Sequence, residues 1–176
     1  MLRLRRRERL RRKEVEGVAE RLLSAFGAVT FAMDAAVERA EVSDDLAALL
    51  LGEEILALEL RGAPVLTVRG LLKWPAAKRW ATVDMGAVPY VYNGADIMAP
   101  GIVDADREIA AGNLVWVRDE RNKRPLAVGE ALMTGAEMAE SRKGKSIQAL
   151  HHVGDEYWTF GHEELETPPA EAPEKA

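Results

Sequence analysis

The chain has 176 residues, of which 48% are hydrophobic and 30% charged, and its formal net charge is −5. This composition is typical of a globular protein with one ordinary domain or two small ones. The chain has no cysteine, which excludes disulfides and thiolate zinc sites, and no apolar run as long as a membrane span. We therefore expect a cytoplasmic protein with no cofactor, no metal and no membrane partner.

The first thirteen residues, MLRLRRRERLRRK, carry a net charge of +7, whereas the rest of the chain carries −12. Because an acidic body repels phosphate, a basic arm favours contact with a polyanion. Two other interpretations stay open: a solvated helix end held by glutamates, or an arm docked on the protein's own acidic face. The candidate residues of this arm are Arg3, Arg5, Arg6, Arg7, Arg9, Arg11, Arg12 and Lys13.

Helical spacing of apolar residues follows the basic arm. The pattern runs through residues 13–26, and Gly27 can end a helix there in a left-handed conformation. The arginines before it are expected to extend this helix or to fray from its start. Residues 28–42 then predict one or two short strands.

The next segments complete a small amino-terminal unit. Residues 43–52, SDDLAALLLG, predict a second helix, with Ser43 as its cap and Gly52 at its end. Residues 53–70 contain two apolar runs on either side of Arg61 and Gly62, which is typical of a hairpin. Residues 1–76 are therefore expected to form a small α+β unit.

The second half is rich in short strands joined by glycine turns, and residues 77–160 predict a small barrel or curled sheet. Thr134 and Glu137 have the spacing of a capping box, which predicts a short helix over 134–142. The tail, 161–176, consists mainly of Pro, Glu and Ala and is expected to be disordered. The expected strands cover residues 81–84, 97–103, 114–118, 125–133, 147–152 and 157–160.

Three blocks of this second half, VDMGAVPYVYNGADIMAPGI, GNLVWVRDERNKRPLAVGEALMTGAEM and GKSIQALHHVGDEYW, resemble a PUA domain. This RNA-binding module is named after pseudouridine synthases and archaeosine transglycosylases. With a small α+β unit in front, the chain is similar to the translation-associated group of single-chain PUA proteins. The resemblance implies an α+β amino-terminal unit followed by a mainly-β PUA pseudo-barrel with short helices.

The resemblance also implies an RNA-binding groove beside the short helix that follows the first strand. Glycines there let a sugar-phosphate chain approach the main chain, although they also serve turns. The implied groove residues are Gly86, Ala87, Val88, Pro89, Gly94, Ala95, Met98, Pro100 and Gly101.

The second wall of the groove, by the same resemblance, comes from the last strands and the loop before them. Arg142, Lys143 and Lys145 are three basic residues within four positions, which favours a phosphate clamp. Cations at the end of a helix are also favourable without any ligand. His151 could stack on a base or bond to it, or could simply be packed.

No catalytic pattern is found, and we expect no enzyme. The sequence has neither a Walker loop nor a Gly-x-Ser-x-Gly elbow. His151 and His152 would point to opposite faces of a strand and so could not share a metal. Asp84 resembles the catalytic Asp of a pseudouridine synthase, but that enzyme's larger catalytic domain is absent, so we expect Asp84 to bond to local backbone N–H groups.

The leading hypothesis is therefore a non-catalytic, monomeric protein that binds structured RNA, either tRNA or rRNA, in translation initiation or ribosome recycling. Its partners could include the small ribosomal subunit or an initiation-factor-like protein. A rival hypothesis is an RNA-binding accessory subunit of an RNA-modifying enzyme. A third is an adaptor between proteins whose groove binds no RNA.

Overall fold

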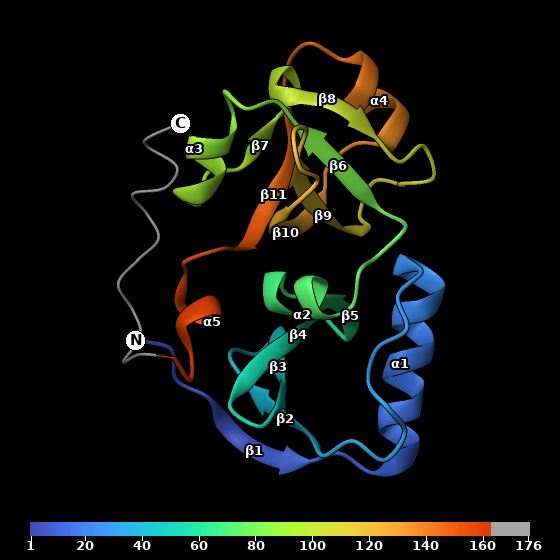
Figure 1. Ribbon diagram of the computed structural model, residues 1–176, viewed down its shortest axis with the longest axis vertical. Coiled ribbons are helices and arrows are strands. Elements are labelled where there is room, and N and C mark those ends of the chain that lie inside the picture. Colours follow the sequence, from blue (N-terminus) through green and yellow to red (C-terminus); the bar gives the residue numbers. More distant parts are fainter. Residues whose placement is uncertain (163–176) are drawn as a thin grey trace. The chain divides into compact units, whose positions relative to one another are not determined.

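The computed structural model describes residues 1–162, and Figure 1 labels the helices and strands along the chain. Its contacts divide the chain into two compact units. Unit 1 contains residues 1–78 together with the segment that begins at Glu156, and unit 2 contains residues 79–155. Most of the expected tail lies outside the described residues.

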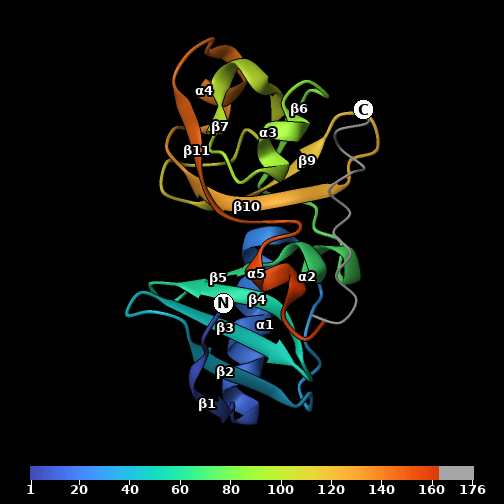
Figure 2. The same cartoon turned by 90° about the vertical axis from the view of Figure 1, so that its left-hand side faces the viewer.

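Unit 1 is a five-stranded antiparallel sheet with one long helix, α1 (Arg12–Phe26), across one face (Figure 2). Its strands, in the order in which they pair, are β1 (Arg5–Arg9), β2 (Val37–Glu41), β3 (Leu46–Leu51), β4 (Glu54–Leu60) and β5 (Ala63–Leu66). The short helix α2 (Val68–Lys73) packs against β4 and β5.

The helix predicted over 13–26 and the hairpin across Arg61 and Gly62 are confirmed. Helix α1 buries Val15, Val18, Leu22 and Phe26, which lie on one stripe because they are three or four residues apart. Gly27 has φ 66° and its N–H donates to the carbonyl of Leu23, so it ends the helix as a left-handed cap.

The helix predicted over 43–52 is wrong, because its core, Leu46–Leu51, is strand β3. This strand lies between β2 and β4 and has four buried residues, so it lacks the alternation that marks an exposed strand. Leucine and alanine favour helices, but strand pairing overrides that weak preference. Gly52 (φ 65°) belongs to the tight turn between Leu51 and Glu54.

The expected helical or frayed form of the basic arm is wrong for Arg5–Arg9, which form strand β1, whereas Arg12 extends helix α1 as expected. The strand pairs antiparallel with β2, and its register places Arg5 opposite Glu41 and Arg9 opposite Glu38. Opposite charges on paired strands attract, which stabilises an extended conformation for this arginine run.

Unit 2 is a curled six-stranded sheet, and the expected fold class is confirmed. Its strands are β6 (Trp80–Val83), β7 (Ile97–Met98), β8 (Ile102–Ala105), β9 (Leu114–Asp119), β10 (Pro125–Ala131) and β11 (Lys145–His152). They pair in the order β7-β11-β10-β9-β6-β8, in which β6 and β9 are parallel and the other pairs antiparallel.

The two outermost strands of this sheet, β7 and β8, are consecutive in the chain. The single strand predicted over 97–103 is therefore wrong, since the 3-10 turn η1 (Ala99–Gly101) separates it into two. Pro100 within the turn lacks an N–H for strand pairing, which explains the break. The result is an almost closed barrel around a buried core that includes Val83, Val117 and Ile147.

Two short helices cover parts of unit 2. Helix α3 (Val88–Tyr92) follows β6, and α4 (Gly135–Glu140) follows β10. The predicted capping box of α4 is confirmed: Thr134 Oγ1 accepts from the Glu137 N–H at 3.1 Å, and Glu137 accepts from the Thr134 N–H at 2.8 Å.

The strand predicted over 157–160 is wrong, because Glu156–Thr159 form helix α5 of unit 1. Arg69 holds this helix, since its guanidinium lies 3.9 Å from the ring centre of Trp158 and donates to the Trp158 carbonyl at 2.8 Å. A strand needs a neighbouring strand to hydrogen-bond with its main chain, whereas a helical turn forms hydrogen bonds between its own N–H and carbonyl groups. Within residues 1–162, no helix is both long and apolar enough to cross a membrane.

Candidate nucleic-acid interface

Unit 2 has an open hollow of about 290 Å³ beside α3 and η1. Residues from the end of β6, from α3 and from the β7–η1 segment surround it. We call it the groove, and its lining residues are Asp84, Gly86, Ala87, Tyr90, Val91, Asp96, Ile97, Met98, Pro100 and Gly101.

Two large side chains are exposed in this groove. Val88 and Val91 lie three residues apart in α3 and are buried, so Tyr90 between them faces outward and is 68% exposed. Met98, in the short strand β7, is 47% exposed. An aromatic ring and a thioether on an otherwise small-residue surface can pack against a flat organic group.

The structure separates the groove residues expected from the sequence into two sets. Those that line the hollow are Gly86, Ala87, Met98, Pro100 and Gly101. The side chain of Val88 is part of the core instead, and Pro89, Gly94 and Ala95 are absent from the lining. Sequence reasoning missed the exposed Tyr90, although the inward spacing of Val88 and Val91 could have indicated it.

The glycines of this region serve different structural purposes. A Cβ on Gly101 would lie 3.0 Å from the Cβ of Ala87, so this glycine permits close approach of η1 to the start of α3. Gly94 has φ +86°, and a Cβ there would lie 3.0 Å from Nε2 of His152. Gly94 therefore serves a turn and a contact with His152, away from the lining of the groove.

Asp84 stands at the entrance of α3, and its expected role as a local hydrogen-bond acceptor is confirmed. Its Oδ1 accepts from the Ala87 N–H at 2.9 Å. Because Pro89 has no N–H and the Ala87 N–H is occupied, the start of this five-residue helix offers few free donors to a phosphate. Contacts to the groove must rely on its side chains and on the main chain around the glycines.

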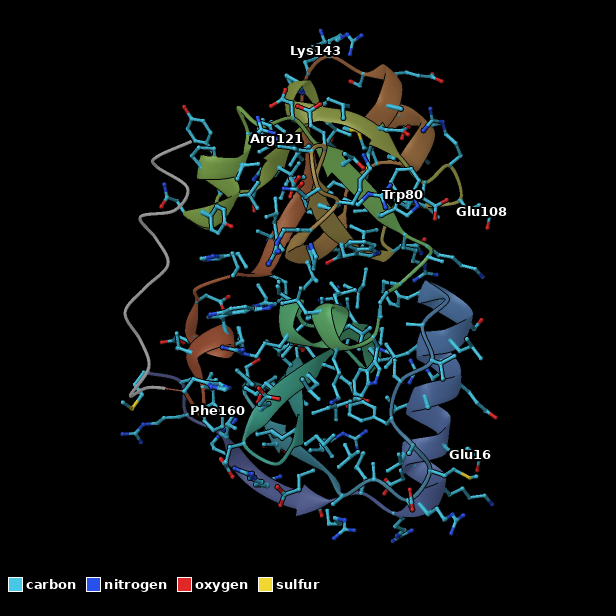
Figure 3. The ribbon with its side chains drawn as sticks, viewed as in Figure 1. Glu16, Trp80, Glu108, Arg121, Lys143 and Phe160 are labelled. Carbon is cyan, nitrogen blue, oxygen red and sulfur yellow. The ribbon has the colours of Figure 1, made fainter. Side chains whose placement is uncertain are left out.

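A basic loop adjoins the Met98 side of the groove. It runs from Arg142 to Lys145, and it is fixed by a hydrogen bond from the Ala99 N–H to the Gly144 carbonyl at 2.8 Å. Within the described chain, Arg142 and Lys143 are exposed and make no ion pair, and Figure 3 shows Lys143 extending outward. The expected clamp residues thus include two available cations.

The third basic residue of this loop is engaged. Lys145 lies opposite Met98 in the pairing of β11 with β7, and its Nζ is 2.9 Å from Oδ2 of Asp96. Asp96 also accepts from the Ala149 N–H at 2.8 Å. The hydrogen bond from Lys145, followed by that from Ala149, lowers the pKa of Asp96, so its carboxylate is ionised near neutrality.

His151 is buried and is held by an aspartate. Its side chain is buried, with a residue exposure of 1%, and its Nδ1 lies 2.9 Å from Oδ1 of Asp155. The same aspartate accepts from the His152 N–H at 2.9 Å. A histidine enclosed in this way has no free face for a nucleobase.

A second basic turn, between β9 and β10, was not among the expected site residues. Its Glu120 accepts from the Met85 N–H at 3.0 Å, which holds the turn beside the end of β6, next to the groove residues Asp84 and Gly86. Arg121 and Arg124 are exposed, and Figure 3 labels Arg121. The signal in the sequence was RNKR, three cations within four residues.

The basic arm of unit 1 is partly neutralised by the protein itself. Arg7 lies 2.8 Å from Glu38 and 2.9 Å from Glu53, and its hydrogen bonds to Glu53 and Glu38 raise its pKa. Arg5 and Arg6 lie 3.8 and 3.4 Å from the carboxylate of Glu41. For these three arginines the structure agrees with the interpretation of an arm docked on an acidic face.

The remaining cations of the arm, Arg3, Arg9, Arg11, Arg12 and Lys13, are exposed and form no ion pair within residues 1–162. Among those residues, no three His, Asp or Glu side chains gather in a way that could hold a metal ion.

Comparison with known proteins identifies the relatives of both units. The family model described as the PUA domain matches residues 79–153. An uncharacterized protein of Methanocaldococcus jannaschii is 45% identical over 119 residues, which cover 68% of this chain and 74% of that protein. Translation machinery-associated protein 20 of Eremothecium gossypii is 30% identical over 124 residues, covering 67% of this chain and 68% of that protein.

A solved structure extends the likeness to most of the chain. The crystal structure of a hypothetical protein from Pyrococcus horikoshii is 34% identical, with a TM-score of 0.75, and the match covers 86% of this chain and 97% of that one. The fungal relative is named for the translation machinery and not for a catalytic activity. The chain therefore belongs to the family of PUA-domain proteins that includes translation machinery-associated protein 20.

Proposed function

We propose that this protein binds structured RNA, a tRNA or an rRNA, without catalysis, and that it acts in translation initiation or ribosome recycling. Membership of the PUA family and relatives named for the translation machinery support RNA binding. The observation that carries the proposal is the groove: an exposed Tyr90 and Met98 lie on small residues beside the uncommitted cations Arg142 and Lys143.

In this proposal the groove and the basic loop contact different parts of the RNA. Tyr90 stacks on a base or on the face of a ribose, because every base offers a π-face. The main chain at Gly86 and Gly101 allows close approach, and Arg142 and Lys143 bind backbone phosphates. The two carboxylates in the groove, Asp84 and Asp96, repel phosphate and direct it toward the loop.

The basic arm adds affinity that does not depend on RNA sequence. Its exposed cations without an ion pair supply this contribution, whereas Arg5, Arg6 and Arg7 contribute less because glutamates already hold them. The partner in translation is the small ribosomal subunit or an initiation-factor-like protein, and the site of action is the cytoplasm.

Equilibrium binding to a full-length tRNA and to an rRNA fragment of equal length tests direct binding. We expect tight binding of one of them with a steep salt dependence. For each phosphate contacted on single-stranded RNA, log K falls by about 0.7 for every tenfold rise in salt concentration. Val103→Ala is a matched control for Tyr90→Ala, because Val103 is also exposed in unit 2 but lies outside the groove. Equal affinity of the parent and Tyr90→Ala would contradict the groove as the site.

Substitution tests the arm better than deletion. Removing residues 1–13 would delete strand β1, the start of α1 and the buried side chain of Leu10. Changing Arg9, Arg11 and Arg12 to Gln keeps the strand and the helix, and should weaken all RNAs about equally.

Crosslinking in cells, followed by identification of the attached RNA, tests the biological setting. Sedimentation of native extract separates the two RNA-binding hypotheses. Migration with small ribosomal subunits supports a role in translation, whereas copurification with an RNA-modifying enzyme would contradict it.

A further inference from the structure

One residue of the groove, Asp96, forms an ion pair with Lys145, which lies outside the lining. Asp96 lines the groove directly before β7, and Lys145 begins β11 on the opposite side of that pairing. Their side chains are 31% and 49% exposed, and Asp96 Oδ2 lies 2.9 Å from Lys145 Nζ. The pair is therefore open to any ligand that enters from the basic loop.

The two oxygens of Asp96 have separate partners. Oδ1 accepts from the Ala149 N–H, which ties the β6–β7 segment to β11. An asparagine could make that hydrogen bond as well, so the structural tie does not require a charge. The charge serves Lys145, through Oδ2.

Lys145 is thus unlike its two neighbours in the loop. Arg142 and Lys143 can bind a phosphate directly, whereas the ammonium group of Lys145 must first leave a carboxylate. A phosphate at the loop and the carboxylate of Asp96 carry the same sign and accept the same hydrogen bonds, so they compete for one donor.

We propose that Asp96 is an internal competitor of the RNA phosphate for Lys145 and so sets the affinity threshold of the groove. When RNA binds, a phosphate replaces the carboxylate of Asp96 as the partner of Lys145. An RNA that places no phosphate near Lys145 leaves the ion pair intact and faces the negative charge of Asp96. The inference rests on the proposed function, since it concerns selectivity at the same site.

The exchange is feasible because the pair is partly exposed. Ion pairs of this kind contribute little net free energy in water, so a phosphate held also by Arg142 and Lys143 can displace the carboxylate. Loss of the Asp96 charge should therefore strengthen RNA binding, which is the opposite of what the loss of a purely structural residue does.

The test measures tRNA binding over a range of KCl concentrations for the parent, Asp96→Asn, Lys145→Met and the double variant. We expect Asp96→Asn to bind about three- to fivefold more tightly. The slope of log K against log salt should steepen by about 0.7, because Lys145 is then free to pair with phosphate. Lys145→Met should change affinity less than about twofold in the parent and about three- to fivefold in the Asp96→Asn background.

Asp104→Asn is the matched control, since it also removes one exposed carboxylate from unit 2 but lies outside the groove and pairs with Arg107. It should change affinity less than about twofold. If Asp96→Asn does not fold, as judged by thermal unfolding, the comparison of Lys145→Met with Arg142→Met still tests the proposal. The proposal requires that Lys145→Met reduce RNA affinity clearly less than Arg142→Met does.

Equal or weaker binding by a folded Asp96→Asn, or an equal effect of Lys145→Met in both backgrounds, overturns the inference and leaves the proposed function intact. Failure of the parent to bind tRNA and rRNA at low salt overturns the proposed function and this inference together.

Discussion

Two basic stretches of the chain, the arm at residues 3–13 and the loop Arg142–Lys145, differ in what their cations already contact. In unit 1, Arg5, Arg6 and Arg7 lie in a strand whose neighbours supply glutamates, and the arginines stabilise the sheet. In unit 2, Arg142 and Lys143 extend from a loop beside an open groove. The arm has more charge, but three of its cations are already held by glutamates, whereas the two unpaired cations of the loop lie beside the groove.

This difference shows that the number of basic residues indicates how strongly a segment attracts a polyanion over a distance. It does not indicate how many of those residues can bind a phosphate directly. Net charge attracts a polyanion from many ångströms away. A contact, however, requires a cation that is not already held by a carboxylate. The following predictions test the contrast between a structural role for charge in unit 1 and a binding role in unit 2.

The largest expected effect is on the stability of unit 1. Glu59 is 6% exposed and accepts two hydrogen bonds from Arg39, at 2.7 and 3.0 Å. Glu59→Gln leaves the partly buried guanidinium of Arg39 with only the more distant Glu14, at 3.9 Å, as counter-charge, and should cost about 2 kcal/mol in the free energy of unfolding. Urea unfolding measures the loss. A fall in the RNA affinity of the folded variant would show that this pair also belongs to the binding site.

The next largest effect is expected on RNA affinity, when the exposed aromatic side chain in unit 2 is removed. Tyr90→Ala should weaken RNA binding about tenfold, since stacking on one base contributes about 1–3 kcal/mol. The melting temperature should hardly change, because the side chain is 68% exposed. Fluorescence anisotropy with labelled tRNA measures the affinity. A large loss of stability instead would identify Tyr90 as a packing residue.

A smaller effect is expected on the salt dependence of RNA binding, and it allows the two basic stretches to be compared directly. Arg142→Gln with Lys143→Gln should reduce the salt slope of RNA binding by about 1.4, which corresponds to two phosphate contacts. Arg5→Gln with Arg6→Gln removes the same charge and should reduce the slope by less than half as much. Equal reductions would mean that Glu41 does not keep its arginines from RNA, and the contrast between the units would fail.

The smallest effect is the pH dependence contributed by Asp96. Because its pKa is lowered in the folded state, the ionised carboxylate stabilises the fold above the ordinary value of about 3.9. This stabilisation is lost as the pH falls through the lowered pKa. The difference in melting temperature between the parent and Asp96→Asn should therefore vanish at low pH. A difference that persists there would have a cause other than ionisation.

Local patterns predicted those parts of the fold in which residues close in sequence decide the structure. The apolar stripe and Gly27 define α1, the spacing of Thr134 and Glu137 defines α4, and two apolar runs define the β4–β5 hairpin. In each case the main-chain partners lie within a few residues. The resemblance of three sequence blocks gave the family and pointed to the segment that forms the groove.

The same patterns failed where distant residues decide. The leucine run of β3 is a strand because β2 and β4 lie on both sides of it, and no local signal reports such neighbours. His151 was a candidate for base contact, but its side chain is buried and its ring contacts Asp155. Lys145 looked equal to Arg142 and Lys143 until Asp96, 49 positions earlier, proved to be its partner.

The sequence by itself determined the family, the class of each unit and the amounts of charge and apolar surface, since composition and short-range spacing carry that information. Tertiary structure decided which cations are free, which glycines border a hollow and which aromatic side chain is exposed. The physical reason is that hydrogen bonds, ion pairs and burial depend on distances across the fold, and only the folded chain brings residues so far apart in sequence to within 3 Å.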